Sequence, residues 1–106
     1  MYAITRQEAP AVPDVITGIF TILSYEAIVL VDPGSSCSFI SYEFALKSHS
    51  TLEFLGYNMC VSMPTGGTVL VNMVIRACPI EIEGRTLHAD LIVINLEEFD
   101  VILGMD

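Results

Sequence analysis

The sequence has few basic residues. Four Lys and Arg stand against thirteen Asp and Glu among 106 residues, which gives a formal net charge of −9. The phosphates of nucleic acids repel a chain with this balance, so we do not expect it to bind nucleic acid. The acids are scattered along the chain rather than clustered, which predicts a solvated acidic surface.

The sequence also lacks apolar segments long enough for a membrane. A spanning helix needs about 20 apolar residues, whereas the apolar stretch at 91–96 is about as long as a strand. Arg6 and Glu8 lie near the start and no apolar stretch follows them, which argues against a signal peptide. We therefore expect no membrane partner and a cytoplasmic protein that is not secreted.

Paired cysteines are absent as well. Cys37, Cys60 and Cys78 form no CxxC motif and cannot all be bridged within one chain, which favours reduced thiols. The spacing of these cysteines with His49 and His88 matches no zinc pattern. The sequence therefore predicts neither a metal site nor another cofactor.

A chain of this length fits one domain. Residues 1–14 contain two prolines and no clear periodicity, which predicts a flexible arm or linker before a domain at 15–106. Hydrophobic residues make up 53% of the chain. This is a high share for a small domain, and it favours an apolar surface covered by a partner, such as a second copy of the chain.

The first half of the domain predicts two strands and a helix. Residues 15–23 alternate and are rich in β-branched side chains, and a short turn at 24–26 follows them. The strand at 27–32 is almost wholly apolar and should be buried on both faces. A short helix is expected at 38–50, with Ser41 as a possible cap. Its expected apolar side consists of Phe39, Ile40, Phe44 and Leu46.

The second half predicts only strands and turns. Its expected elements are strands at 58–63 and 68–75 around a Gly-rich turn at 64–67, a hairpin at 78–94 that turns at 83–85, and a strand at 99–106. The pattern as a whole indicates a mostly-β domain with one short helix.

Asp32 stands at the end of the apolar strand, immediately before a turn. Gly34 offers an unobstructed N–H, and Ser35 offers an N–H and a hydroxyl, so this sequence can present one well-held carboxylate. The same residues also suit an ordinary β-turn with Asp first and Pro-Gly in the middle. The four residues alone leave both interpretations open.

Three features together resemble one protein family. The segment "VLVDPGSSCSFIS" at 29–41 resembles the active-site loop of the retropepsins, specifically those of plant gypsy-type LTR retrotransposons. The segment "ADLIVINLEEFDVILGMD" at 89–106 resembles the end of that domain, and the hairpin tip at 64–67 falls where the family carries its flap. The order and spacing agree over about residues 15–106.

The resemblance implies an all-β, pepsin-like acid-protease half-barrel with one short helix. It implies an aspartic endopeptidase that cuts a retrotransposon Gag–Pol polyprotein in the retrotransposon particle, with an extended peptide as substrate. It also implies a homodimer in which each chain supplies one catalytic aspartate. Mapped onto this sequence, it implies these site residues: catalytic Asp32; active-site loop Pro33, Gly34, Ser35 and Ser36; flap Met63, Pro64, Thr65, Gly66 and Gly67; loop-supporting Ile102, Leu103 and Gly104.

The sequence departs from the family at two points. Retropepsins usually have Thr or Ser after the aspartate, and its hydroxyl braces the two loops of the dimer, whereas this chain has Pro33. The family also continues into a helix that often begins with Trp-Leu, whereas this sequence stops at Asp106 and contains no Trp. Both departures predict a weaker dimer. They keep open a catalytically weak or inactive dimerisation or peptide-binding module, and a host protein that has adopted such a domain.

Other nucleophiles fit less well. Ser35 and Ser36 lack a GxSxG elbow and have no His nearby in the sequence. Cys37 is expected to fill space in the loop, and His88 to lie on the surface of a strand. The acids that flank the final apolar segment lack the turn chemistry of Asp32 and are expected to be structural or solvated: Asp100 and Asp106.

Overall fold

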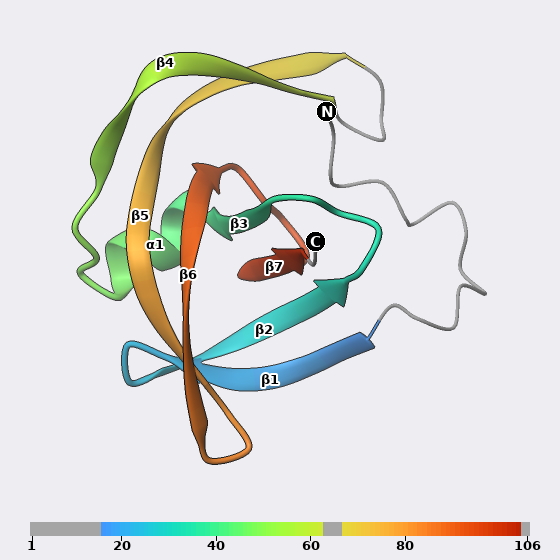
Figure 1. Cartoon of the computed structure of the whole chain (residues 1–106), viewed down its shortest axis with the longest axis vertical. Helices are drawn as coiled ribbons and strands as arrows, with labels where there is room; N and C mark the ends of the chain where they lie inside the picture. The colour runs from blue at the N-terminus through green and yellow to red at the C-terminus, as the bar shows by residue number, and fades with distance from the viewer. Residues whose placement is uncertain (1–15, 63–66, 105–106) are drawn as a thin grey trace.

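One strongly curved sheet with a short helix forms the domain (Figure 1). The computed structural model describes residues 16–62 and 67–104, so the expected arm at 1–14 lies outside the described residues. The elements are β1 Ile16–Ile22, β2 Tyr25–Asp32, β3 Ser38–Ser41, α1 Tyr42–Lys47, β4 Glu53–Ser62, β5 Thr68–Ile82, β6 Arg85–Ile94 and β7 Val101–Gly104.

The sheet bends back on itself. Its strand order is β1-β2-β7-β3-β6-β5-β4, and β1 pairs a second time, with β5 through Thr21 and Ile22. Most neighbours are antiparallel, whereas the β2–β7 and β3–β6 pairs are parallel. The predicted class, an all-β half-barrel with one short helix, is confirmed.

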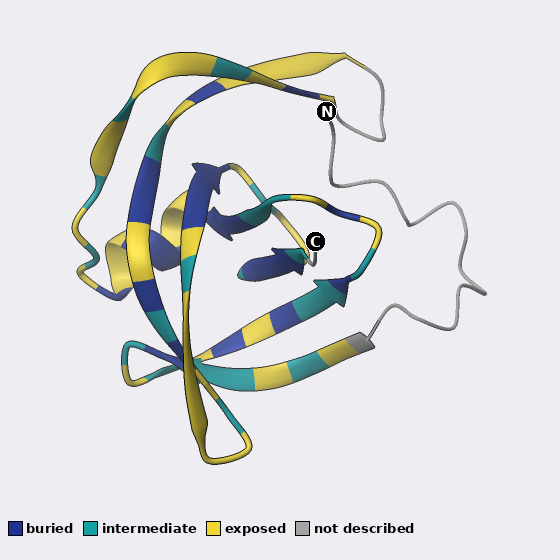
Figure 2. Ribbon diagram, in the orientation of Figure 1, coloured by how far each residue is buried: buried dark blue, intermediate teal, exposed yellow. Residues whose placement is uncertain are grey.

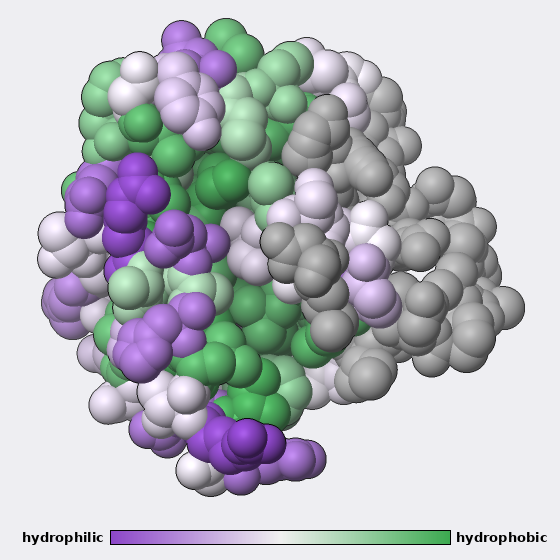
Figure 3. Space-filling model, in the orientation of Figure 1, coloured by the Kyte–Doolittle hydropathy of each residue, from purple (hydrophilic) through white to green (hydrophobic). Residues whose placement is uncertain are grey.

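Two apolar clusters fill the domain, as expected for a folded sheet with two packed faces. The first contains buried residues of β1, β2, α1 and β5–β7, such as Val29 and Leu91. The second contains Phe39, Val61, Val71 and Ile102, among others. Burial is concentrated in β3, β7 and the end of β6, whereas β4 is mostly exposed (Figure 2). Hydrophobic residues also gather in the middle of the face shown in Figure 3.

The predicted helix at 38–50 is wrong in its first part. Residues 38–41 form β3, and Phe39 and Ile40 pair with β7 and are completely buried. The backbone of β3 pairs with both β6 and β7, and its apolar side chains enter different clusters, Ile40 the first and Phe39 the second, which favours the strand over a longer helix. Ser41 caps α1 as predicted, because its Oγ accepts the Phe44 N–H at 3.0 Å. Leu46, predicted to lie on the apolar side, is 53% exposed.

The expectation that the strand at 27–32 is buried on both faces is also wrong. Ala27 and Val29 are buried, but Ile28 is 45% exposed. Ile28 pairs with Ile19 of β1, which is exposed as well. The described residues thus leave part of this face of β1 and β2 uncovered.

The strands after α1 are longer than the sequence indicated. β4 begins at Glu53 rather than at residue 58, and β5 runs without a break from Thr68 to Ile82. The expected interruption of β5 near 75–78 is a register shift against β6, where Ala77 adopts a φ of +51°. A bulge lets one strand continue while its pairing shifts.

Candidate active site

Asp32 is the last residue of β2, and the turn after it holds its carboxylate. The Gly34 N–H donates to Asp32 Oδ1 at 2.9 Å, and the Ser35 N–H donates to the Asp32 carbonyl oxygen at 3.0 Å. The residues therefore form a β-turn, with Pro33 at the position where its fixed φ fits. Asp32 is only 1% exposed, and a carboxylate so buried requires hydrogen bonds of this kind.

β7 lies against the loop that follows Asp32. β2 and β7 are parallel, and their register places Leu30 beside Ile102 and Asp32 beside Gly104. A Cβ on Gly104 would lie 2.6 Å from the Ser35 carbonyl oxygen and still closer to that of Cys37. Glycine is required here because the backbones of β7 and the loop touch.

The other residues expected to support the loop precede Gly104 in β7. Ile102 is completely buried and Leu103 is 7% exposed. The Gly104 N–H donates to Ser38 Oγ at 3.0 Å, which ties the end of β7 to the start of β3. Gly104 thus contacts the loop after Asp32 directly, whereas Ile102 and Leu103 pair with Leu30 and Val31, the residues just before Asp32.

Ser35 braces the loop. Its side chain is buried, and its Oγ donates to the Cys37 carbonyl oxygen at 2.7 Å and accepts the Cys37 N–H at 3.4 Å. Pro33 is half-buried, whereas Gly34 and Ser36 are exposed. The Ser35 hydroxyl and N–H, expected to help hold the Asp32 carboxylate, instead bond backbone atoms of Cys37 and Asp32 and so shape the turn.

The β4–β5 hairpin carries the segment expected to be the flap. Val61 of β4 and Val71 of β5 are buried in the cluster that also contains Phe39 and Ile102. Leu30, two residues before Asp32, packs against the same cluster. The two strands of the hairpin and the residue two positions before Asp32 therefore pack in one apolar cluster. Gly67 is exposed with a φ of +79°, and the remaining expected flap residues lie outside the described residues: Met63, Pro64, Thr65 and Gly66.

Asp100 connects β2 to β3. Its Oδ2 accepts the Ile28 N–H at 2.8 Å, and its own N–H donates to the Ile28 carbonyl oxygen at 2.8 Å. Its carbonyl oxygen accepts the Ser41 N–H at 2.8 Å. Asp100 is thus structural, as predicted, and His88 is exposed on β6, as predicted. Asp106 lies outside the described residues.

The cysteines are free thiols in three different environments. Cys37 is half-buried, Cys60 is exposed and Cys78 is buried. Desolvation by burial raises the pKa of the Cys78 thiol. Within residues 16–62 and 67–104, no three His, Cys, Asp or Glu side chains are placed to hold a metal ion. No helix in the same part of the chain is long and apolar enough to cross a membrane.

Comparisons with known proteins agree with this architecture. A family model described as retroviral aspartyl protease matches residues 1–106. The solved structure of EIAV protease complexed with the inhibitor HBY-793 is 18% identical, with a TM-score of 0.65, and the match covers 89% of this chain and 85% of that one. The retroviral protease-like domain of Ddi1 from Leishmania major is 17% identical, with a TM-score of 0.62 and coverage of 87% and 73%. A search of curated proteins found no match. The structural matches confirm the retropepsin-like fold.

Proposed function

This chain belongs to the retroviral aspartyl protease family, and from that premise we propose that it is an aspartic endopeptidase active as a homodimer. The observation that carries the proposal is the setting of Asp32. Its carboxylate is buried at the end of β2, accepts the Gly34 N–H, and belongs to a loop supported by the backbone of Gly104. A carboxylate fixed in this way is prepared for acid–base chemistry.

The proposed mechanism needs two copies of Asp32. The described residues hold one strand that ends in Asp-x-Gly, so a two-fold dimer supplies the second carboxylate. Two adjacent carboxylates share one proton, and the pair titrates as a coupled unit. The ionised member takes a proton from a bound water, which attacks the peptide carbonyl carbon. The protonated member donates a hydrogen bond to the carbonyl oxygen, and no covalent enzyme intermediate forms.

We propose an extended peptide as the substrate. The β4–β5 hairpin would cover it and pair with its backbone, as sheet edges do with extended peptides. The resemblance of residues 29–41 to plant gypsy-type retropepsins supports a Gag–Pol polyprotein as the source of the peptide. The proposed place of action is then the retrotransposon particle in the cytoplasm.

Pro33 favours a second candidate function, a dimerisation or peptide-binding module with little or no catalysis. Proline offers neither a hydroxyl nor an N–H, so its side chain cannot brace the two loops of a dimer. Each missing hydrogen bond would cost about 1 kcal/mol at the centre of the interface. The related Leishmania domain is itself described only as protease-like. A host protein that uses such a domain would fit this alternative equally well.

Cleavage of a mixed peptide library tests the proposal. We would compare the unmodified chain, Asp32→Asn and the matched control Glu43→Gln, which changes an exposed acid in the first turn of α1. Between about pH 4 and 7, we expect acid-favoured cleavage that Asp32→Asn lowers by at least about 10²-fold and Glu43→Gln leaves unchanged. Cleavage unaffected by Asp32→Asn would contradict the proposal. No cleavage by any variant, at concentrations that enforce dimers, would support the binding module.

A further inference from the structure

The β4–β5 hairpin has interrupted pairing near its base. Glu53 and Phe54 of β4 pair with β5, but the register then shifts, and regular pairing resumes only at Met59. Gly56 lies within this interruption with a φ of +95°. On the other edge of β5, the register against β6 shifts between Ile75 and Cys78. Such bulges remove ladder hydrogen bonds and bend strands, so the backbone alone fixes the angle of the hairpin weakly.

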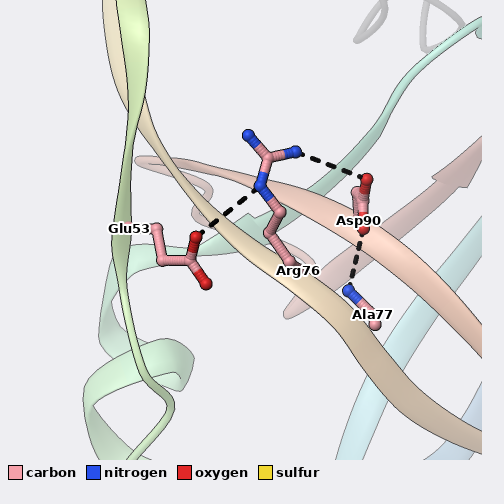
Figure 4. Close-up of polar contacts among 4 residues, drawn as sticks. All are labelled: Glu53, Arg76, Ala77 and Asp90. Atoms are coloured by element: carbon pink, nitrogen blue, oxygen red, sulfur yellow. Dashed lines mark hydrogen bonds and ion pairs between the residues drawn. The ribbon is translucent and has the colours of Figure 1, made fainter.

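Arg76 lies within the second interruption, on β5, and connects three strands (Figure 4). Its Nε lies 3.7 Å from Glu53 Oε1 of β4, and its Nη1 lies 3.7 Å from Asp90 Oδ2 of β6. The other oxygen of Asp90, Oδ1, accepts the Ala77 N–H at 2.8 Å. The Arg76 guanidinium and the carboxylates of Glu53 and Asp90 thus link three strands near the places where their ladders are irregular.

The side chains around Arg76 are not closely packed, so packing does little to hold these strands in place. Arg76 lines a groove of about 690 Å³ on one side, together with Leu55, Tyr57 and Asp90. It also lines a smaller hollow of about 240 Å³ with Glu53 and His49. β4 and β6 lie on opposite sides of β5, and the hollows beside Arg76 leave this part of the three strands loosely packed. The charged contacts are therefore well placed to set the angle between these strands.

We propose that Arg76 is a positioning residue for the β4–β5 hairpin. Its contacts to Glu53 and Asp90 hold the base of the hairpin, so that Val61 and Val71 stay packed against the apolar cluster beside Asp32. The ion pairs of Arg76 are to Glu53 and Asp90, and Arg76 shares the larger groove with Ser36 and Cys37 of the loop after Asp32. The consequence for cleavage rests on the proposed function, because only a hairpin that covers a substrate can change how the substrate binds.

Amide hydrogen exchange tests this role without requiring catalysis. In Arg76→Gln, we expect amides at 59–62 and 69–71 to exchange about 2- to 5-fold faster, the range that half-exposed ion pairs supply. Amides of β1 and β2 should not change. Arg85→Gln removes the same charge from an exposed residue at the start of β6 and should leave the hairpin unchanged. Arg76→Lys should restore part of the protection. Salt should accelerate hairpin exchange in the unmodified chain and in Arg85→Gln, which both keep the ion pairs, but not in Arg76→Gln.

Equal exchange in Arg76→Gln and Arg85→Gln would overturn the proposal. So would acceleration spread evenly over the domain, because that would indicate general destabilisation. Combining Arg76→Gln with Glu53→Gln and with Asp90→Asn gives two double-mutant cycles. Purely additive effects on the exchange of the hairpin amides would also count against the ionic link.

Peptide cleavage then tests the functional consequence. We expect Arg76→Gln to raise KM about 2- to 5-fold with little change in kcat, because a hairpin covers ground state and transition state alike. Faster hairpin exchange with an unchanged KM would overturn the link to substrate binding. A chain that cleaves nothing would contradict the proposed function, and the exchange data would still decide the role of Arg76.

Discussion

Replacing Gly104 by Ala tests how the active-site loop is built. The new Cβ would lie 2.6 Å from the Ser35 carbonyl oxygen and closer still to that of Cys37, whereas real Cβ contacts stay above 3.0 Å. Both neighbours are backbone atoms, so no side chain can rotate away. The loop that carries Asp32 must move, or β7 must separate from β2.

The expected cost follows from overpacking a buried contact. Such changes destabilise proteins by about 1–3 kcal/mol, and a clash with two carbonyl groups belongs at the upper end of this range. For a domain of this size, a loss of about 3 kcal/mol lowers Tm by on the order of 10–20 °C. The rate of peptide cleavage should fall by more than the loss of folded molecules explains, because the loop that holds Asp32 shifts even in molecules that stay folded.

Urea and thermal unfolding, followed by circular dichroism, would measure this cost. Gly18→Ala is the matched control, because its Cβ would meet only the Phe20 ring, at 3.3 Å, and that side chain can move. We expect the control to change stability by less than about 1 kcal/mol. If Gly104→Ala unfolds at the same urea concentration as Gly18→Ala, the proposed contact between β7 and the loop is wrong.

Two further predictions concern stability. Burial raises the pKa of Cys78, so the unfolded chain loses this proton at lower pH than the folded one. The free energy of unfolding should therefore fall as pH rises above about 8.5. Urea titrations should show a smaller fall in Cys78→Ala. Ser41→Ala removes the cap of α1 and should lower the free energy of unfolding by about 1 kcal/mol. Thermal unfolding would check the effect of Ser41→Ala, with Ser62→Ala at an exposed strand position as the control. Equal Tm values for the two variants would contradict the role of the cap.

Local sequence predicted the parts of the site that local chemistry determines. The apolar run before Asp32 and the Pro-Gly pair after it define a strand and a turn without help from the rest of the chain. The strand predicted at 99–106 follows from its apolar residues in the same way, and the structure limits it to β7, Val101–Gly104. Local chemistry does not show that Gly104 touches the loop, a relation between segments about 70 residues apart; only the family resemblance implies it, and the structure gives its geometry.

Features that depend on distant partners were not predictable. β3 has four residues, and its extended form depends on pairing with β6 and β7, more than 50 residues further along the chain. The exposure of Ile28 likewise depends on which strands cover its face of the sheet. The link from Glu53 through Arg76 to Asp90 leaves no sequence pattern, because register shifts decide which charged side chains meet.

Mixing the unmodified chain with Asp32→Asn tests whether two copies of Asp32 form one active site. Unmodified chain, at a concentration that keeps it dimeric, would be mixed with an equal amount of Asp32→Asn and assayed for peptide cleavage. Random pairing should then reduce the rate to about half that of the unmodified chain alone, and a threefold excess should reduce it to about a quarter. A rate that does not fall as Asp32→Asn is added would show that one chain suffices, and would contradict the paired site.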